Sequence, residues 1–131
     1  MNATTGLTRG IAAVSGRLPA ALLLVLAALP AVASDPPPAF GVCLACHTVS
    51  PGASSREGPN LHGVMGRIAG VTPGFVFSAA MQGSGITWTP EELDRFIAAP
   101  SARVPGTSMI FIGVDEPAER REIIDYLKTA R

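Results

Sequence analysis

Two cysteines and a histidine in a Cys-x-x-Cys-His motif are the residues best suited to chemistry in this sequence. Cys43 and Cys46 are the only cysteines among the 131 residues, and His47 follows directly. On a helix, two thiols at this spacing lie about one turn apart. They could reach two vinyl groups on one edge of a porphyrin while His47 turns its imidazole toward the iron. The motif is therefore typical of covalent haem attachment.

Two other chemistries use cysteines at this spacing. A disulfide redox pair usually follows a strand in a βαβ unit, and the sequence shows no such unit. A structural zinc ion needs four protein ligands, and the chain could offer Cys43, Cys46, His47 and His62. Adjacent Cys46 and His47 point in different directions, which disfavours zinc. We interpret the motif as the site of one haem c, covalently bound through Cys43 and Cys46.

An iron atom held by one histidine needs a sixth ligand or keeps an open site. The candidates after the motif are one histidine and three methionines: His62, Met65, Met81 and Met109. Most methionines are packing residues, but Met109 lies in a Pro-Gly-rich segment about sixty residues after the motif, enough chain to reach the opposite haem face. Histidine and methionine would close both axial positions and raise the reduction potential. The sequence therefore predicts one-electron transfer, with His47 and Met109 as the ligands to iron.

Two other functions are compatible with a haem on this chain. A ligand-binding sensor or haem enzyme would have a displaceable sixth ligand, which the Met109 segment argues against. A haem subunit of a dehydrogenase or oxidase complex would also transfer electrons, but would be found bound to that complex. We expect an electron carrier, not an enzyme.

The first 33 residues have the composition of an export signal. They contain no acidic residue, two arginines, an apolar run over residues 20–29 and the small residues Ala31-Val32-Ala33. This pattern is typical of a cleaved secretory signal peptide, and the apolar run is shorter than the roughly 20 residues of a membrane span. We predict a signal peptide over residues 1–33 and a periplasmic haem domain over residues 34–131. An uncleaved signal segment would instead tether the protein to the membrane.

The predicted mature domain is small and weakly acidic. Residues 34–131 carry eight Lys and Arg against ten Asp and Glu, a net charge of −2, without a basic stripe interleaved with aromatic residues. Nucleic acid is therefore not an expected partner. Such a short domain buries a modest core, which a large bound group would complete. We expect a monomer.

The motif is predicted to follow a short helix. Asp35 could cap this helix, with Pro36 at its first position, and the helix would run into His47. Residues 48–60 are rich in turn formers and predict a loop. Residues 61–65 predict one helical turn closed by Gly66, and residues 66–87 are expected to be mostly irregular.

Two further helices are predicted in the second half of the domain. Thr89, Pro90 and Glu92 form a capping box with proline at the first helical position. Apolar residues then recur at helical spacing until Pro100 ends the helix. Residues 100–114 predict a loop. A last helix is predicted from Asp115 or Glu116, with its apolar face formed by Ile123, Ile124 and Leu127.

Five segments between residues 39 and 128 occur in a characteristic order. They are CLACHTV at 43–49, GPNLHG at 58–63 with Gly66 and Arg67, GITW at 85–88, VPGTSMIF at 104–111, and the pairing of ER at 119–120 with IDYL at 124–127. In these segments the chain resembles the class I c-type cytochromes, the family of mitochondrial cytochrome c and its soluble bacterial relatives. The resemblance implies an all-α fold, with three to five short helices and long loops wrapped around one covalently bound haem.

The resemblance also implies roles for individual residues. His47 would be the proximal ligand and Met109 the distal ligand. The carbonyl group of Pro59 would accept a hydrogen bond from the other ring nitrogen of His47. Arg67 and the indole N–H of Trp88 would face a haem propionate.

Several positions depart from the family pattern. The segment before the motif is short, so we expect Phe40 to supply its packing against the last helix. Phe77, Met81 and Phe96 replace polar residues of many relatives, which predicts a drier haem pocket. The lysines that surround the haem edge in mitochondrial cytochrome c are missing, with Val42 and Ser108 among the replacements.

The expected partners are redox proteins. The resemblance implies a quinol–cytochrome c reductase, a terminal oxidase or a dehydrogenase, which the sequence does not distinguish. Because the lysines around the haem edge are missing, we expect partner contacts that depend less on charge.

Overall fold

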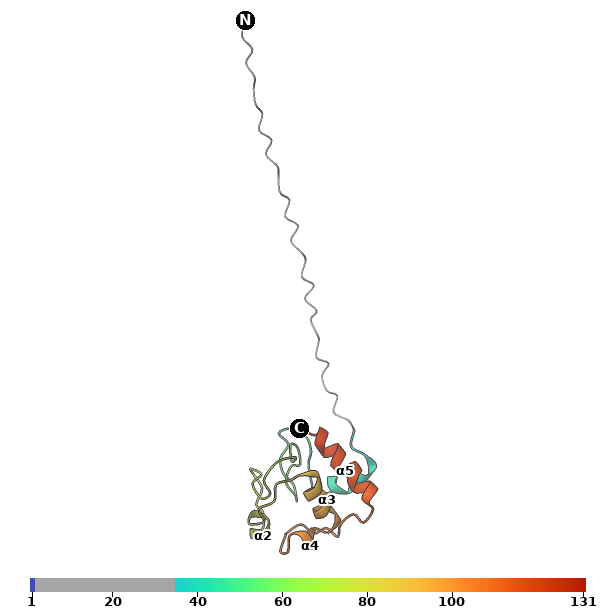
Figure 1. Ribbon diagram of the computed structural model, residues 1–131. Helices are drawn as coiled ribbons and strands as arrows, with labels where there is room; N and C mark the ends of the chain where they lie inside the picture. The colour runs from blue at the N-terminus through green and yellow to red at the C-terminus, as the bar shows by residue number, and fades with distance from the viewer. Residues whose placement is uncertain (2–34) are drawn as a thin grey trace. The chain divides into compact units, whose positions relative to one another are not determined.

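The structure is a computed structural model that describes residue 1 and residues 35–131. The predicted signal peptide, apart from Met1, lies outside these residues. Short helices and long connecting loops make up the described domain (Figure 1). The helices are the 3₁₀ helix η1 (Pro38–Phe40) and the α-helices α1 (Gly41–Leu44), α2 (Ala79–Gln82), α3 (Pro90–Ala98), α4 (Pro100–Arg103) and α5 (Pro117–Thr129).

Residues 35–131 form no β-strand, and pairing of extended backbone is limited to one antiparallel bridge between Ile68 and Thr87. The predicted all-α fold is thus confirmed. No helix in this part of the chain combines the length and apolar character needed to cross a lipid bilayer.

Helix α3 begins where the capping motif predicts. The Thr89 hydroxyl accepts a hydrogen bond from the backbone N–H of Glu92 at 3.2 Å, and Pro90 is the first helical residue. The capping box is only half formed, because the Glu92 carboxylate binds the side chains of Arg95 and Arg103 instead. This carboxylate therefore ties α3 to α4.

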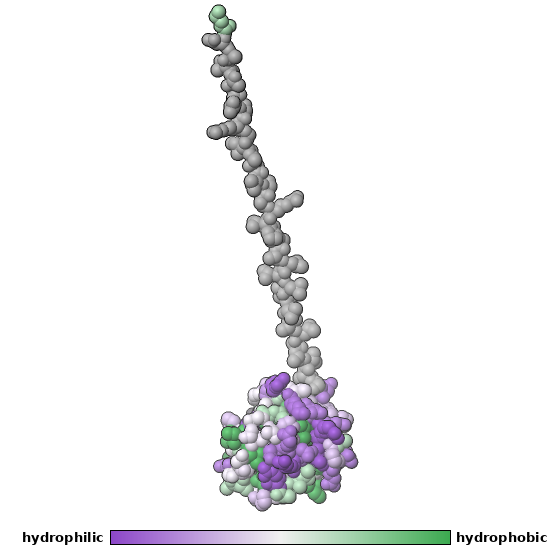
Figure 2. All heavy atoms as spheres, in the orientation of Figure 1, coloured by the Kyte–Doolittle hydropathy of each residue, from purple (hydrophilic) through white to green (hydrophobic). Residues whose placement is uncertain are grey.

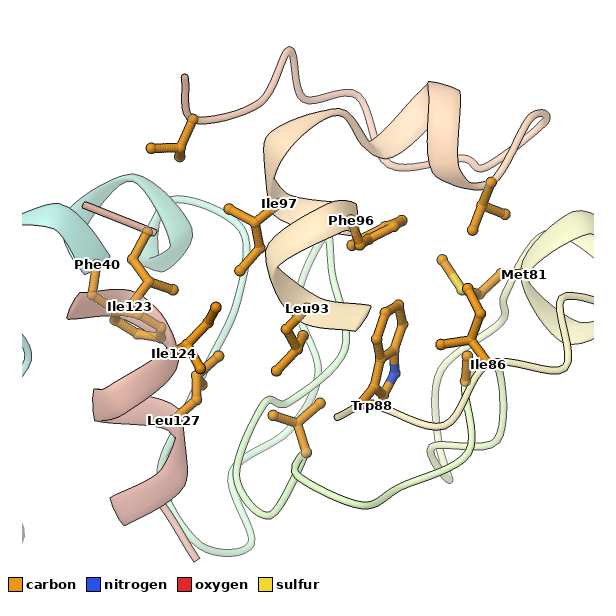
Figure 3. Packing of buried hydrophobic residues seen from close by; sticks show 14 residues of the cluster. Phe40, Met81, Ile86, Trp88, Leu93, Phe96, Ile97, Ile123, Ile124 and Leu127 are labelled. Carbon is orange, nitrogen blue, oxygen red and sulfur yellow. The ribbon is translucent and has the colours of Figure 1, made fainter. Parts of the chain in front are cut away.

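Helix α5 packs against both α3 and η1, and these contacts build one side of the core (Figure 3). Ile123, Ile124 and Leu127 are buried on its inner face, as predicted. Phe40 is fully buried, and its ring centroid lies 4.7 Å from that of Tyr126 on α5. Phe40 thus supplies the expected packing between the segment before the motif and the last helix.

Several predicted helix boundaries were wrong. Asp35 caps no helix: the first helical residue is Pro38, and α1 ends at Leu44 rather than His47. Residues 61–65 form turns instead of a helical turn. Two short helices, α2 and α4, lie in regions predicted to be loops. Each has only four residues, too few for a clear periodic pattern of apolar residues.

Candidate functional site

A cavity of about 370 Å³ lies beside the Cys-x-x-Cys-His motif. Cys43, Cys46 and His47 line it, and so does Met109, which is distant in sequence. Most other lining side chains are apolar and come from the loops, from α3 and from α5; they include Leu61, Val64, Phe75, Phe77, Met81, Leu93, Phe96, Ile97, Ile123 and Leu127. The volume is in the range of sites for small molecules and cofactors.

The backbone around the motif forms a tight turn after α1. The N–H groups of Cys46 and His47 both donate to the carbonyl group of Cys43, at 3.1 and 2.9 Å. The N–H of Gly58 donates to the carbonyl group of Cys46 at 2.9 Å, which attaches the next loop to the motif. This turn places both cysteines and the histidine on the cavity wall.

The His47 ring is oriented by the loop that follows the motif. Its Nδ1 donates a hydrogen bond to the carbonyl oxygen of Pro59 at 2.7 Å, the contact that the family resemblance implied. Because the carbonyl oxygen can only accept, the proton sits on Nδ1 and the lone pair on Nε2. Burial lowers the pKa of His47, and the hydrogen bond to Pro59 opposes this effect. The ring is thus prepared as a neutral ligand through Nε2.

Gly58 is a contributor to the site that was not among the predicted site residues. A Cβ atom at this position would lie 2.3 Å from Cε1 of His47 and 2.6 Å from its Nδ1. Only a residue without a side chain leaves the ring this close to the backbone. The glycine in the GPNLHG segment was the available signal in the sequence.

The cysteine geometry argues against a disulfide redox pair. Cys43 and Cys46 form no disulfide bond with each other. Burial raises the pKa of Cys43 to about 11, whereas reactive Cys-x-x-Cys pairs rely on a depressed pKa. The raised pKa of Cys43 therefore disfavours disulfide exchange at this residue.

Zinc is not supported either. Among residues 35–131, no three His, Cys, Asp or Glu side chains are close enough together to hold a metal ion. His62 does not line the cavity and faces a separate polar pocket with Asn60 and Thr72.

Two methionines line the cavity. Met109 is half-buried in the loop after α4, whereas Met81 lies on α2, almost fully buried in the core (Figure 3). Met65 is not a lining residue. Met81 packs near Ile86 and Trp88 in the view of Figure 3, as a core residue does.

Arg67 and Trp88 lie together on another part of the cavity wall. The Arg67 guanidinium donates to the carbonyl groups of Asn60 and His62 and, at 2.8 Å, to the hydroxyl of Thr72. Within the described domain it has no carboxylate partner. The Trp88 ring packs on Phe96, with centroids 5.0 Å apart, and its indole N–H finds no acceptor among residues 35–131.

These features fit a covalently bound haem. The apolar wall suits the porphyrin, the two thiols suit its vinyl groups, and His47 Nε2 suits its iron. The guanidinium without a carboxylate partner and the free indole N–H would suit an anionic propionate.

Known cytochromes are similar to this chain in sequence and in structure. The chain is 44% identical over 111 residues to cytochrome c2 of Blastochloris viridis, covering 81% of this chain and 87% of the relative. It is 45% identical over 96 residues to cytochrome c2 iso-2 of Magnetospirillum fulvum, covering 73% of this chain and 99% of the relative. The structure of cytochrome cH from Methylobacterium extorquens aligns with a TM-score of 0.66 and 42% identity, covering 70% of this chain and 91% of that one. No protein-family model matches the chain.

Proposed function

Because this chain belongs to the class I c-type cytochromes, which are electron carriers and not enzymes, we propose that it transfers single electrons with His47 and Met109 as ligands to its haem iron. One observation carries the ligand assignment: His47 and Met109, which are about sixty residues apart in the sequence, line the same cavity. Haem c, held through Cys43 and Cys46, supplies one-electron chemistry between ferric and ferrous iron.

The residues around the cavity would restrict the haem to electron transfer. Pro59 holds the His47 proton on Nδ1, so Nε2 is available to the iron. Met109 would hold the iron together with His47, which would leave no iron position for a substrate. The apolar wall, including Phe77, Met81 and Phe96, excludes water from the pocket. Low polarity and a fixed ligand set limit the rearrangement that accompanies electron transfer.

Arg67 and Trp88 are proposed to hold a propionate. Arg67 is fixed by three neutral acceptors and brings an uncompensated positive charge to the cavity. Trp88 brings one N–H donor without an acceptor in the described domain. A carboxylate between them would satisfy both groups.

We place the mature protein in the periplasm, as residues 34–131, after removal of the predicted signal peptide. The composition of residues 1–33 supports this placement. A mass measurement on protein from its native host tests it, because retention of residues 1–33 would indicate a membrane-tethered form.

The surface around the cavity suggests how redox partners dock. Val42 and Ile110 line the cavity and are 48% and 102% exposed. Lys128, the only lysine, pairs with Asp125 on α5. Figure 2 shows hydrophobic patches beside hydrophilic regions on the face in view. We therefore propose that donor and acceptor proteins contact an apolar rim, defined here by Val42 and Ile110, with little steering by charge.

The visible spectrum tests the ligand assignment. A sulfur ligand gives ferric haem a weak band in the far red. Met109→Ala should abolish this band and yield a high-spin or exchangeable iron, whereas Met65→Leu and Met81→Leu should retain it. A far-red band that persists in Met109→Ala would overturn the assignment. A wild-type protein that is high-spin would instead favour a ligand-binding sensor or haem enzyme.

A further inference from the structure

We propose that Arg120 and Asp94 are positioning residues for Met109. They form a clamp that fixes one end of the loop over residues 105–112, which we name the Met109 segment. This proposal rests on the assignment of Met109 as an iron ligand. Arg120 and Asp94 lie outside the cavity and would hold that ligand in place.

Arg120 joins three parts of the fold. Its Nε donates to Oδ1 of Asp94 on α3 at 2.7 Å. Its Nη1 donates to the carbonyl groups of Val114 and Asp115, at 2.9 and 2.8 Å. The Arg120 side chain is 12% exposed, whereas that of Asp94 is 46% exposed, so the guanidinium end of the clamp is the better shielded from water and salt. One guanidinium therefore connects α5, α3 and the residues that directly follow the Met109 segment.

The same end of the segment is attached to α3 through the backbone. The N–H of Val114 donates to the carbonyl group of Ile97 at 2.9 Å, and Val114 is buried. Gly113 has a φ of 119° and passes so near the helix end that a Cβ atom would lie 2.1 Å from the carbonyl oxygen of Ala98. Arg120 thus holds a stretch of backbone that lies directly against α3.

The opposite end is held by α4. Val104 is buried, and its N–H donates to the carbonyl group of Pro100 at 2.9 Å. The N–H of Thr107 donates to the Val104 carbonyl group at 3.0 Å, and the Thr107 hydroxyl accepts from the N–H of Met109 at a long 3.3 Å.

Between these two anchors the segment has little support of its own. Ile110 and Ile112 are almost fully exposed. Within the described domain, the N–H groups of residues 110–112 donate no hydrogen bond. Met109 lies four residues from Gly113, so loosening the clamp frees the chain on the C-terminal side of the ligand. The lifetime of the Met109–iron bond should therefore depend on Arg120.

The test compares ferric holoprotein variants in two measurements. Arg120→Gln and Arg120→Lys remove the fixed three-bond geometry, and Lys retains the charge. Asp94→Asn weakens one bond of the clamp. Imidazole can bind the iron only after Met109 leaves, so its binding rate should rise about tenfold in Arg120→Gln, as expected for the loss of hydrogen bonds made by a charged group. Hydrogen exchange of the Val114 amide should accelerate in parallel.

Two controls separate positioning from general stability. Arg121→Gln removes the same charge from an exposed neighbouring position on α5. Ile124→Val weakens the core at a residue that does not line the cavity. Both should bind imidazole at the wild-type rate well below the unfolding temperature.

The outcomes distinguish this proposal from the ligand assignment. If Arg120→Gln bound imidazole and exchanged its Val114 amide hydrogen at the wild-type rates, the proposed clamp would be wrong. Met109 would remain the assigned ligand. An equal rise in imidazole binding in Ile124→Val would also overturn it. If Met109→Ala retained the far-red band, the ligand assignment would fail, while Val114 exchange would still report whether Arg120 holds the segment.

Discussion

The Nδ1 atom of His47 donates a 2.7 Å hydrogen bond to the carbonyl oxygen of Pro59, on the loop that closes over the Cys-x-x-Cys-His turn. This bond fixes both the tautomer and the direction of the ring. It is possible only because Gly58, the residue before Pro59, leaves room for the imidazole. The proximal side of the pocket therefore depends on a glycine and a carbonyl group as much as on the histidine itself.

Gly58→Ala should displace the His47 ring. The added Cβ would lie 2.3 Å from Cε1 of His47, too close for a real contact. We expect a loss of about 1–3 kcal/mol in the free energy of unfolding, together with a shifted haem spectrum. Denaturant unfolding and the visible spectrum of the holoprotein measure these effects.

Gly41→Ala is the matched control for that change. Gly41 has a helical φ of −54°, and no atom lies within 4 Å of the position that a Cβ would take. Alanine there should be neutral or stabilise by about 0.4–1 kcal/mol. If Gly58→Ala and Gly41→Ala had the same free energy of unfolding and the same visible spectrum, the position of the His47 ring would not depend on Gly58.

Arg67→Gln should lower the reduction potential of the haem. Arg67 carries a positive charge on the cavity wall, and a nearby positive charge disfavours the oxidised iron, which has the higher charge. The variant also loses hydrogen bonds from a charged group, which should cost about 2 kcal/mol of stability. Redox titration and denaturant unfolding measure the two effects.

Arg56→Gln makes the same change of charge at an exposed position. The Arg56 guanidinium donates a single 3.2 Å hydrogen bond, to the carbonyl group of Leu44. Removal of the Arg56 charge should lower the reduction potential of the haem less than removal of the Arg67 charge does. If both variants gave the same small shift, Arg67 would be no more than a surface charge, and the propionate role would be rejected.

Val42→Asp should slow electron transfer to the native partner. Val42 belongs to the apolar rim of the cavity and is 48% exposed, so the variant places a charge where we expect an apolar contact. A central contact residue can change affinity by more than about 1 kcal/mol, and we expect about a tenfold lower second-order rate constant. Stopped-flow kinetics with the purified partner measure it.

Val71→Asp controls for the introduced charge. Val71 is 55% exposed and does not line the cavity. It should transfer electrons at the wild-type rate, and both variants should retain the wild-type spectrum. A steep fall in the wild-type rate with added salt, against an acidic partner, would contradict docking through an apolar rim.

Gly113→Ala should destabilise the attachment to α3 that follows the Met109 segment. Gly113 combines a positive φ with close approach to the Ala98 carbonyl oxygen. Gly66 also has a positive φ, of 75°, but no atom lies within 4 Å of a Cβ at that position. Gly66→Ala should therefore cost about 1–2 kcal/mol for its backbone alone, and Gly113→Ala about 1–3 kcal/mol more. Denaturant unfolding of the pair measures this difference, and equal losses would show that the contact with α3 is unimportant.

The sequence by itself determined the chemistry at one edge of the site. Cys43, Cys46 and His47 are neighbours in the chain, so their relation to a haem follows from a single turn of backbone. The starts of α3 and α5 were also readable, because the caps at Thr89 and Glu116 are local signals. The signal peptide over residues 1–33 rests on composition and stays a prediction.

Only the tertiary structure decided what surrounds that edge. Met81 and Met109 both line the cavity, Gly58 makes room for His47, and Arg120 reaches from α5 to the end of the Met109 segment. The short helices α2 and α4 were not predicted either, because four residues are too few to show a periodic pattern of apolar residues. Such features depend on contacts between residues distant in sequence, and local preferences carry no information about those contacts until the chain has packed.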